Sequence, residues 1–164
     1  MAFRAEWNVE KTAEANARVF LPALAEEYFE AGRKLLRKKS THRALHRFRL
    51  KTKRFRYTLE LFRDVYGASL ERRLELLRPI QSALGDINDC AATIELLEKK
   101  PGKERKAIQS FLEKRAAKKT AEFERLWRNT FDAPGQSKAW VDLLARRHPA
   151  RKRAKAETGS PPDS

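Results

Sequence analysis

Apolar residues return along most of the chain at the three- and four-residue steps that place them on one face of an α-helix. In the segment 8–39 we predict a helix in which Pro22 starts a second piece or introduces a kink, because proline removes a backbone donor and crowds the preceding turn. The apolar residues that carry this pattern are Val9, Ala13, Phe20, Leu24, Tyr28 and Leu35.

The second helical stretch has the clearest pattern. Ser40 and Thr41 are suited to cap its first turn, since their hydroxyl groups can accept hydrogen bonds from unpaired backbone N–H groups. Gly67 suits the left-handed position that follows a last helical turn. We therefore predict one long helix over residues 41–66, closed at Gly67.

The third stretch covers residues 68–100. We expect it to be interrupted at Pro79 and at Gly85-Asp86, and to end at Pro101-Gly102, because proline and glycine disfavour the interior of a helix. Its predicted core positions are Leu70, Leu74, Leu77, Gln81 and Leu84.

The fourth stretch covers residues 103–131, and a short helix near 140–146 follows it. Four long helices with short connections favour an antiparallel up-down bundle, so we predict an all-α fold with one domain over residues 1–146. Residues 147–164 contain no apolar residue larger than alanine, and we expect a disordered basic tail there. The predicted core positions of the fourth stretch are Ile108, Phe111, Leu112, Phe123 and Leu126.

The charge of the chain indicates a negatively charged partner. Of its 164 residues, 37 are Lys or Arg and 22 are Asp or Glu, which gives a formal net charge of +15 and an isoelectric point of about 10.3. Such an excess exceeds what solubility requires. Nucleic acid, anionic lipid and polyphosphate all fit this charge.

Cysteine usage and the N-terminal residues bear on the compartment. Cys90 is the only cysteine, so the chain has neither a disulfide nor a pair of thiols for a zinc site. Residues 1–10 lack the apolar segment of a signal peptide, and no stretch approaches the roughly 18 apolar residues of a membrane span. We expect a cytoplasmic protein without a membrane span.

The predicted second helix has one face that is almost wholly cationic or titratable. At about 100° per residue, His42, His46, Arg49, Lys53, Arg56 and Glu60 form one stripe, with Tyr57 at its edge. On spacing alone, a solvated face is the more common interpretation of such a stripe. Leu50, Leu61 and Val65 flank it, however, and so we expect the cations to face a cleft between helices, where a lower dielectric constant strengthens attraction to an anion.

Two cations of the fourth stretch strengthen this interpretation. Arg115 and Lys119 fall between Leu112 and Phe123, where a simple bundle would place leucines. Inward-facing cations are costly unless something negative lies between them, so we expect these two side chains to form an opposing wall of the cleft. Glu60 and Glu122 can offset part of the charge as salt bridges, but not six or more cations.

Two ordered motifs resemble a known family. The sequence LHRFRLKTKRFRYTLELF at residues 45–62 resembles the signature of the CHAD family, the conserved histidine α-helical domain. Residues 41–100 form the part of this chain that contains the family motifs. LGDIND at residues 84–89 resembles a second element of the family, and it is followed by a helix that contains ATIELL. The first motif falls on His46, Arg49, Lys53, Arg54, Arg56 and Tyr57.

The resemblance implies an all-helical protein without catalytic activity that binds inorganic polyphosphate along a basic channel. It implies polyphosphate contacts from the motif residues, to which the helical spacing adds His42 and, in support, Arg115 and Lys119. Asn88 and Asp89 would lock or orient the basic helix, and Tyr57 would either donate a hydrogen bond to phosphate or pack. The resemblance also implies association with polyphosphate granules and their proteins.

The chain departs from the family in one respect, because CHAD proteins usually contain two four-helix halves and this sequence resembles one. Either two chains rebuild the channel as a homodimer, or one chain binds with a single half-site. We favour the homodimer.

Other functions have weaker support in the sequence. Nonspecific nucleic-acid binding is the main alternative, although no base-stacking platform or helix-turn-helix pattern is evident. A metal-dependent phosphotransfer or polyphosphate-hydrolysing enzyme would need metal-binding carboxylates, and the central helix offers mainly Glu60. His42 and His46 are an i, i+4 pair and so only half a metal site, among cations that would repel a metal ion. We therefore predict no catalytic residue, metal or cofactor.

Overall fold

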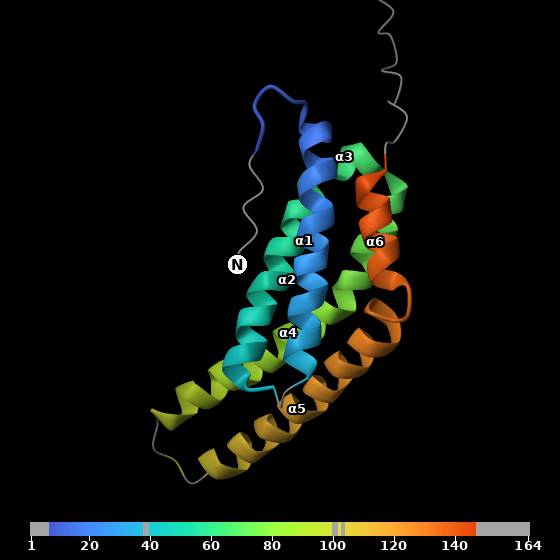
Figure 1. The fold of residues 1–164 in the computed structure, drawn as a ribbon. Coiled ribbons are helices and arrows are strands. Elements are labelled where there is room, and N and C mark those ends of the chain that lie inside the picture. Colours follow the sequence, from blue (N-terminus) through green and yellow to red (C-terminus); the bar gives the residue numbers. More distant parts are fainter. Residues whose placement is uncertain (1–6, 38–39, 100–101, 103, 147–164) are drawn as a thin grey trace, which may run out of the picture.

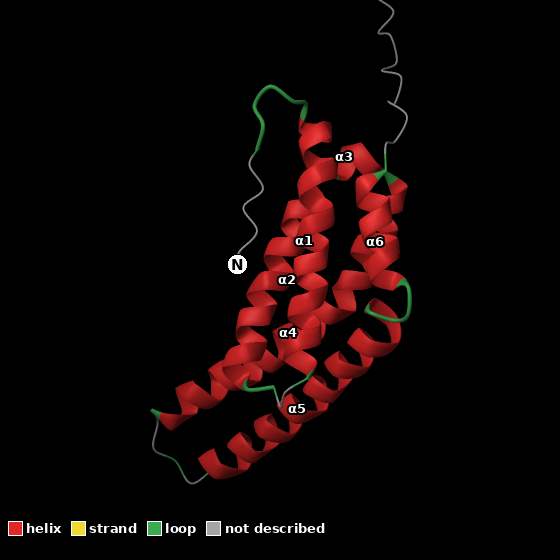
Figure 2. Cartoon of the chain, viewed as in Figure 1, coloured by secondary structure: helices red, strands yellow, loops and turns green. Residues whose placement is uncertain are grey.

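A computed structural model describes residues 7–37, 40–99, 102 and 104–146, and this part of the chain contains helices and loops but no strand (Figure 2). The all-α class is thereby confirmed. The α-helices are α1 (Ala13–Leu36), α2 (His42–Leu61), α3 (Arg63–Tyr66), α4 (Ala68–Glu98), α5 (Arg105–Leu126) and α6 (Gln136–Ala145), and a π-helix, η1 (Trp127–Phe131), follows α5. The predicted basic tail lies outside the described residues.

The helices pack against one another in neighbouring pairs (Figure 1). Helix α1 packs against both α2 and α6, while α4 packs against α2 on one side and α5 on another. The last turns of α4 and the first turns of α5 extend beyond the other helices as a two-helix hairpin. Helix α4 is thus the element that joins the basic helix α2 to α5.

No described helix is divided into two pieces at a predicted interruption. Helix α1 continues through Pro22, and α4 continues through both Pro79 and Gly85. Each proline costs one helical hydrogen bond, but buried neighbours such as Leu21 and Ile80 hold these long helices against the core. Tertiary packing therefore outweighs the local preference of proline.

Helix α2 begins as predicted and ends earlier. The Thr41 hydroxyl accepts a hydrogen bond from the Ala44 amide at 3.3 Å, which confirms the predicted cap. At its other end the backbone of Phe62 leaves helical geometry, with φ −107° and ψ 18°, and the short helix α3 then closes at Gly67, where φ is 57°. This break redirects Tyr66, whose hydroxyl donates to the Leu144 carbonyl at 2.7 Å.

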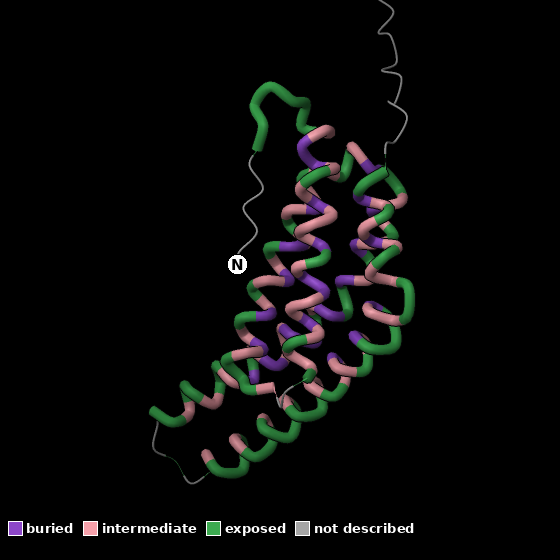
Figure 3. Tube along the Cα trace, viewed as in Figure 1, coloured by how far each residue is buried: buried purple, intermediate pink, exposed green. Residues whose placement is uncertain are grey.

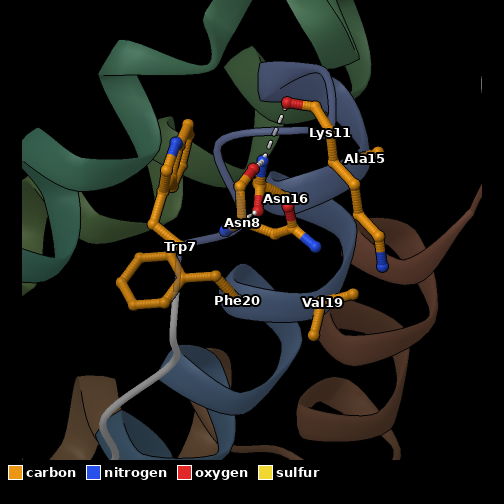
Figure 4. A pocket seen from close by; sticks show the side chains of 7 residues that line it. All are labelled: Trp7, Asn8, Lys11, Ala15, Asn16, Val19 and Phe20. Atoms are coloured by element: carbon orange, nitrogen blue, oxygen red, sulfur yellow. Dashed lines mark hydrogen bonds between the residues drawn. The ribbon is translucent and has the colours of Figure 1, made fainter.

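Helix α1 begins five residues after the predicted start because an asparagine organises the preceding loop. The Asn16 side chain donates to the carbonyls of Asn8 at 2.8 Å, Lys11 at 3.2 Å and Thr12 at 3.1 Å, and accepts from the Asn8 amide at 2.9 Å. Figure 4 shows Asn8, Lys11 and Asn16 beside Trp7 and Phe20 around a small pocket. Lys11 is the only cation that lines this pocket, so the pocket is not a candidate site for binding a polyanion.

The core is rich in stacked aromatic rings. The Tyr28 ring stacks on Phe55 with centroids 4.4 Å apart, and its hydroxyl lies 2.9 Å from the Thr52 hydroxyl. Burial raises the pKa of Tyr28 well above its usual value. Beyond the end of α4, the chain contributes Phe123, Trp127, Phe131, Trp140 and Leu144 to this core.

The projecting hairpin has little burial. We call residues 91–98 and 105–122 the arm; none of them is buried, as Figure 3 shows by the absence of purple along this segment. The predicted core stripe of α5 is therefore wrong at Ile108 and Phe111, which are exposed, and correct at Phe123, which is buried. The early turns of α5 have the right periodicity but only α4 to pack against.

Candidate functional site

Helix α2 carries seven Arg and Lys residues and a single acid, Glu60. Lys51 is paired with Glu27 of α1, and Arg56 donates from Nε to Glu60 at 2.8 Å. The remaining cations, which are Arg43, Arg47, Arg49, Lys53 and Arg54, have no acidic group within 4.0 Å in the described part of the chain. The helix therefore presents an excess of positive charge.

Two polar contacts tie one edge of α2 to α4. The Nδ1 atom of His46 lies 2.6 Å from Oδ1 of Asn88, and Arg56 donates from Nη1 to Oε1 of Gln81 at 2.6 Å. Because His46 and Arg56 run one way along α2 while Asn88 and Gln81 run the other way along α4, the two helices are antiparallel. The seam between them is thus fixed at two points.

The predicted basic stripe follows this seam. We keep the name basic stripe for His42, His46, Arg49, Lys53 and Arg56, of which His42 is exposed and the other four are half-buried. Arg49 and Lys53 lie between the two contacts with α4 and have no ion-pair partner among the described residues. Half-burial reduces solvation of these cations, which strengthens their attraction to an anion.

A shallow pocket lies at the N-terminal end of the stripe. Its lining comes from α2 and α4, and the rings of His42 and His46 are 6.5 Å apart between centroids. The lining side chains include several hydrogen-bond donors and one carboxylate, so the pocket can donate hydrogen bonds to a phosphate group. The residues that line it are His42, Arg43, His46, Asn88, Ala92 and Glu95.

Arg54 and Tyr57 are exposed on the outer side of α2. The guanidinium carbon of Arg56 lies 5.7 Å from the centroid of the Tyr57 ring, so this ring has a cation beside it. Leu50 and Leu61 are also exposed, which confirms that apolar side chains border the stripe. Among the described residues, the side-chain hydrogen bonds that join the stripe to another helix all go to α4, so the expected enclosure by helices on both sides is not seen there.

Arg115 and Lys119 do not face the basic stripe. Both pair with Asp86 of α4, Arg115 at 3.7 Å and Lys119 at 3.1 Å. Asp86 and Asn88 are two residues apart, and at about 100° per residue they point to nearly opposite sides of α4. The predicted opposing wall is therefore not formed within one chain, since α4 separates these cations from α2.

The two salt bridges expected from the sequence are present. Glu60 pairs with Arg56, and Glu122 pairs with Lys119 at 2.9 Å. Hydrogen bonds to Glu122, and then to Asp86, raise the pKa of Lys119 above its ordinary value. Lys119 is therefore already paired with carboxylates.

Of the two predicted supporting residues, Asn88 contacts the basic helix through His46. Asp89 is exposed, and its backbone carbonyl accepts a hydrogen bond from the Thr93 hydroxyl at 2.8 Å. Gln81 and Glu95 also reach the seam, although sequence reasoning placed Gln81 in the core and left out Glu95. Their spacing was the missed signal, since Gln81, Asn88 and Glu95 recur every seven residues and so share one helical face.

Two searches of the described residues bear on other functions. No group of three or more His, Cys, Asp or Glu side chains in this part of the chain could hold a metal ion. Within the same residues, no helix is long and apolar enough to cross a membrane.

Comparison with known proteins gives one match. The family model described as the CHAD domain matches residues 2–98. No curated protein and no solved structure matches the chain. The matched region ends with α4, so α5, η1 and α6 lie beyond it.

Proposed function

The chain belongs to the CHAD family, and from this premise we propose that it binds inorganic polyphosphate along the basic stripe of α2 and does not catalyse a reaction. The observation that supports this most is the pair Arg49 and Lys53. They are half-buried, lie between two fixed contacts with α4, and have no acidic partner in the described part of the chain.

The geometry of the stripe suits a linear polyanion. From His42 to Arg56 the stripe spans fourteen helical steps, or about 21 Å at 1.5 Å per residue. Its members recur every three or four residues, so one cationic or titratable side chain is presented per turn. Arginine can also engage two phosphate oxygens at once.

A homodimer is part of this proposal. The described part of one chain supplies one such stripe on α2, and α4 borders it along one edge. Leu50, Tyr57 and Leu61 are exposed beside the stripe, with Leu61 82% exposed, and they offer an apolar surface to a second chain. The molecular mass in solution with and without polyphosphate tests this part, and a monomer that binds tightly at saturation would rule it out.

Binding of nucleic acid is the alternative that shares the same electrostatics. It has less support, because Tyr57 is the only exposed Phe, Tyr or Trp side chain of α2 and stacking of bases on aromatic rings carries much single-strand binding. An enzyme is supported less again, since Glu60, the only acid of α2, is already paired with Arg56. We propose a cytoplasmic protein that associates with polyphosphate granules.

The test is a binding titration of labelled polyphosphate at two salt concentrations. The double variant Arg49→Ala/Lys53→Ala should weaken binding at least tenfold and reduce its salt dependence by about two counterions, because each lost phosphate contact removes roughly one from the slope. The matched control is Arg128→Ala/Lys138→Ala, which removes the same charge from exposed positions outside α2.

Three outcomes would contradict the proposal. An equal loss in the control variant would mean that net charge alone governs binding. Equal competition by DNA at matched phosphate concentration would favour the nucleic-acid alternative. Release of phosphate from polyphosphate in the presence of Mg²⁺ would show an enzyme.

A further inference from the structure

The contact between His46 and Asn88 constrains the protonation of the histidine. Nδ1 of His46 lies 2.6 Å from Oδ1 of Asn88, and an amide oxygen can only accept a hydrogen bond. With Oδ1 of Asn88 turned toward the ring, the proton of this bond lies on Nδ1. In a neutral imidazole only one nitrogen carries a proton, so Nε2 is then an acceptor.

A phosphate oxygen without a proton is also only an acceptor. Neutral His46, held by Asn88 in this tautomer, thus presents a lone pair to a phosphate in the pocket and not a donor. Nε2 becomes a donor when the imidazole takes up a second proton, and the ring then also carries a positive charge.

We propose that Asn88 is a positioning residue that makes anion binding at the His46 end of the basic stripe take up one proton. This inference rests on the proposed function and adds its regulation by pH. It does not require Asn88 to touch the ligand.

The charged groups near His46 favour uptake upon binding. His42 and Arg43 of α2 and Glu95 of α4 line the same pocket as His46, while Arg49 lies one turn further along α2 and Asp89 follows Asn88. On the side of α2 that packs against α1, Glu27 is occupied by Lys51. A bound polyanion adds negative charge beside the His46 ring, and this charge favours the protonated imidazolium.

Linkage sets the size of the effect. A step that binds one proton changes the affinity by up to tenfold per pH unit. Affinity for polyphosphate should therefore rise as the pH falls.

The first measurement is the dissociation constant for polyphosphate from pH 5.5 to 8.5 at constant ionic strength. The wild-type protein should lose up to tenfold in affinity per unit above neutrality. His46→Gln should flatten this dependence of affinity on pH. His42→Gln should weaken binding but leave the dependence on pH unchanged. Asn88→Asp retains the acceptor and adds a negative charge that favours the imidazolium, so its binding should persist to higher pH.

The second measurement is the ¹⁵N spectrum of the histidine rings in the wild-type protein, which needs no variant to fold. At pH 8.5 His46 should have its proton on Nδ1, and saturating polyphosphate near pH 7 should protonate both nitrogens. A proton on Nε2 at pH 8.5 would overturn the inference, since the amide of Asn88 would then be reversed. A His46→Gln slope equal to that of the wild type would also overturn it.

The outcomes separate this inference from the proposed function. Polyphosphate binding that is tight and independent of pH rejects the inference and leaves the function in place. Absence of binding throughout pH 5.5–8.5 rejects the proposed function. The terminal phosphates of the ligand also titrate. The pH dependence that remains with the His46→Gln variant measures their contribution, because the ligand is the same in both titrations.

Discussion

Gly32 of α1 lies directly against the indole of Trp127. A Cβ atom at Gly32 would be 2.1 Å from Cζ2 of Trp127, closer than real atoms approach. The tryptophan is buried in the aromatic core, so it has little room to move. This contact ties the helix before the basic stripe to the π-helix that follows α5.

Gly32→Ala should therefore destabilise the fold by about 1–3 kcal/mol, as overpacked core substitutions do. Gly85→Ala is the matched control, because Gly85 is also inside a helix and a Cβ there meets nothing within 4 Å. It should stabilise the protein by roughly 0.5–1 kcal/mol through the better helix propensity of alanine. Urea denaturation measures both, and a neutral Gly32→Ala would contradict the close contact.

Two phenylalanines of α5 should differ strongly in their contribution to stability. Phe123 is fully buried and Phe111 is 63% exposed. Phe123→Ala should cost about 3–5 kcal/mol, as expected for a buried phenylalanine. Phe111→Ala should change stability by less than about 0.5 kcal/mol, as surface substitutions do. A large loss of stability for Phe111→Ala in the monomer would contradict the exposure of Phe111, because it would mean that other residues cover this part of the arm.

Residues 99–146 should be required for folding, although the family match ends at residue 98. Trp127, Phe131 and Trp140 belong to the core, and without them Tyr28 and Phe29 would lose ring contacts. A chain that ends at residue 98 should lack a cooperative thermal transition in circular dichroism. A chain that ends at residue 146 should retain it, and cooperative melting of the shorter chain would contradict this prediction.

Stability should fall as the pH rises from 10 to 12. Burial raises the pKa of Tyr66 to about 12, whereas a tyrosine of the unfolded chain ionises near its ordinary value of 10.0. Between these values the unfolded chain loses a proton that the folded chain keeps, which favours unfolding. The midpoint of urea denaturation at several pH values measures the effect. Tyr66→Phe should reduce the pH slope, and an unchanged slope would assign the effect to other groups.

The sequence was a good guide to local structure where helical signals were strong. Thr41 caps α2 as its hydroxyl predicts, and the stripe from His42 to Arg56 lies on one face. It was a poor guide at Pro22, Pro79 and Gly85, because local propensities of about 1–3 kcal/mol are small beside the packing of a long helix. Whether a helix breaks there depends on contacts that the sequence does not reveal.

The candidate site was predicted in part for the same reason. Periodicity identified the basic stripe because all its members are on one helix. It could not place Arg115 and Lys119, whose direction depends on how α5 crosses α4. It also assigned Gln81 to the core, since a polar residue at a seam and one in a core have the same helical spacing.

By itself, the sequence determined the helical class, the excess of positive charge, the cationic face of α2 and the motifs of the CHAD family, because these are properties of residue type and spacing along single helices. The tertiary structure alone decided that α4 lies between the two groups of cations and that Asn88 meets His46. Those relationships join residues far apart in the chain, and they follow from the packing of whole helices.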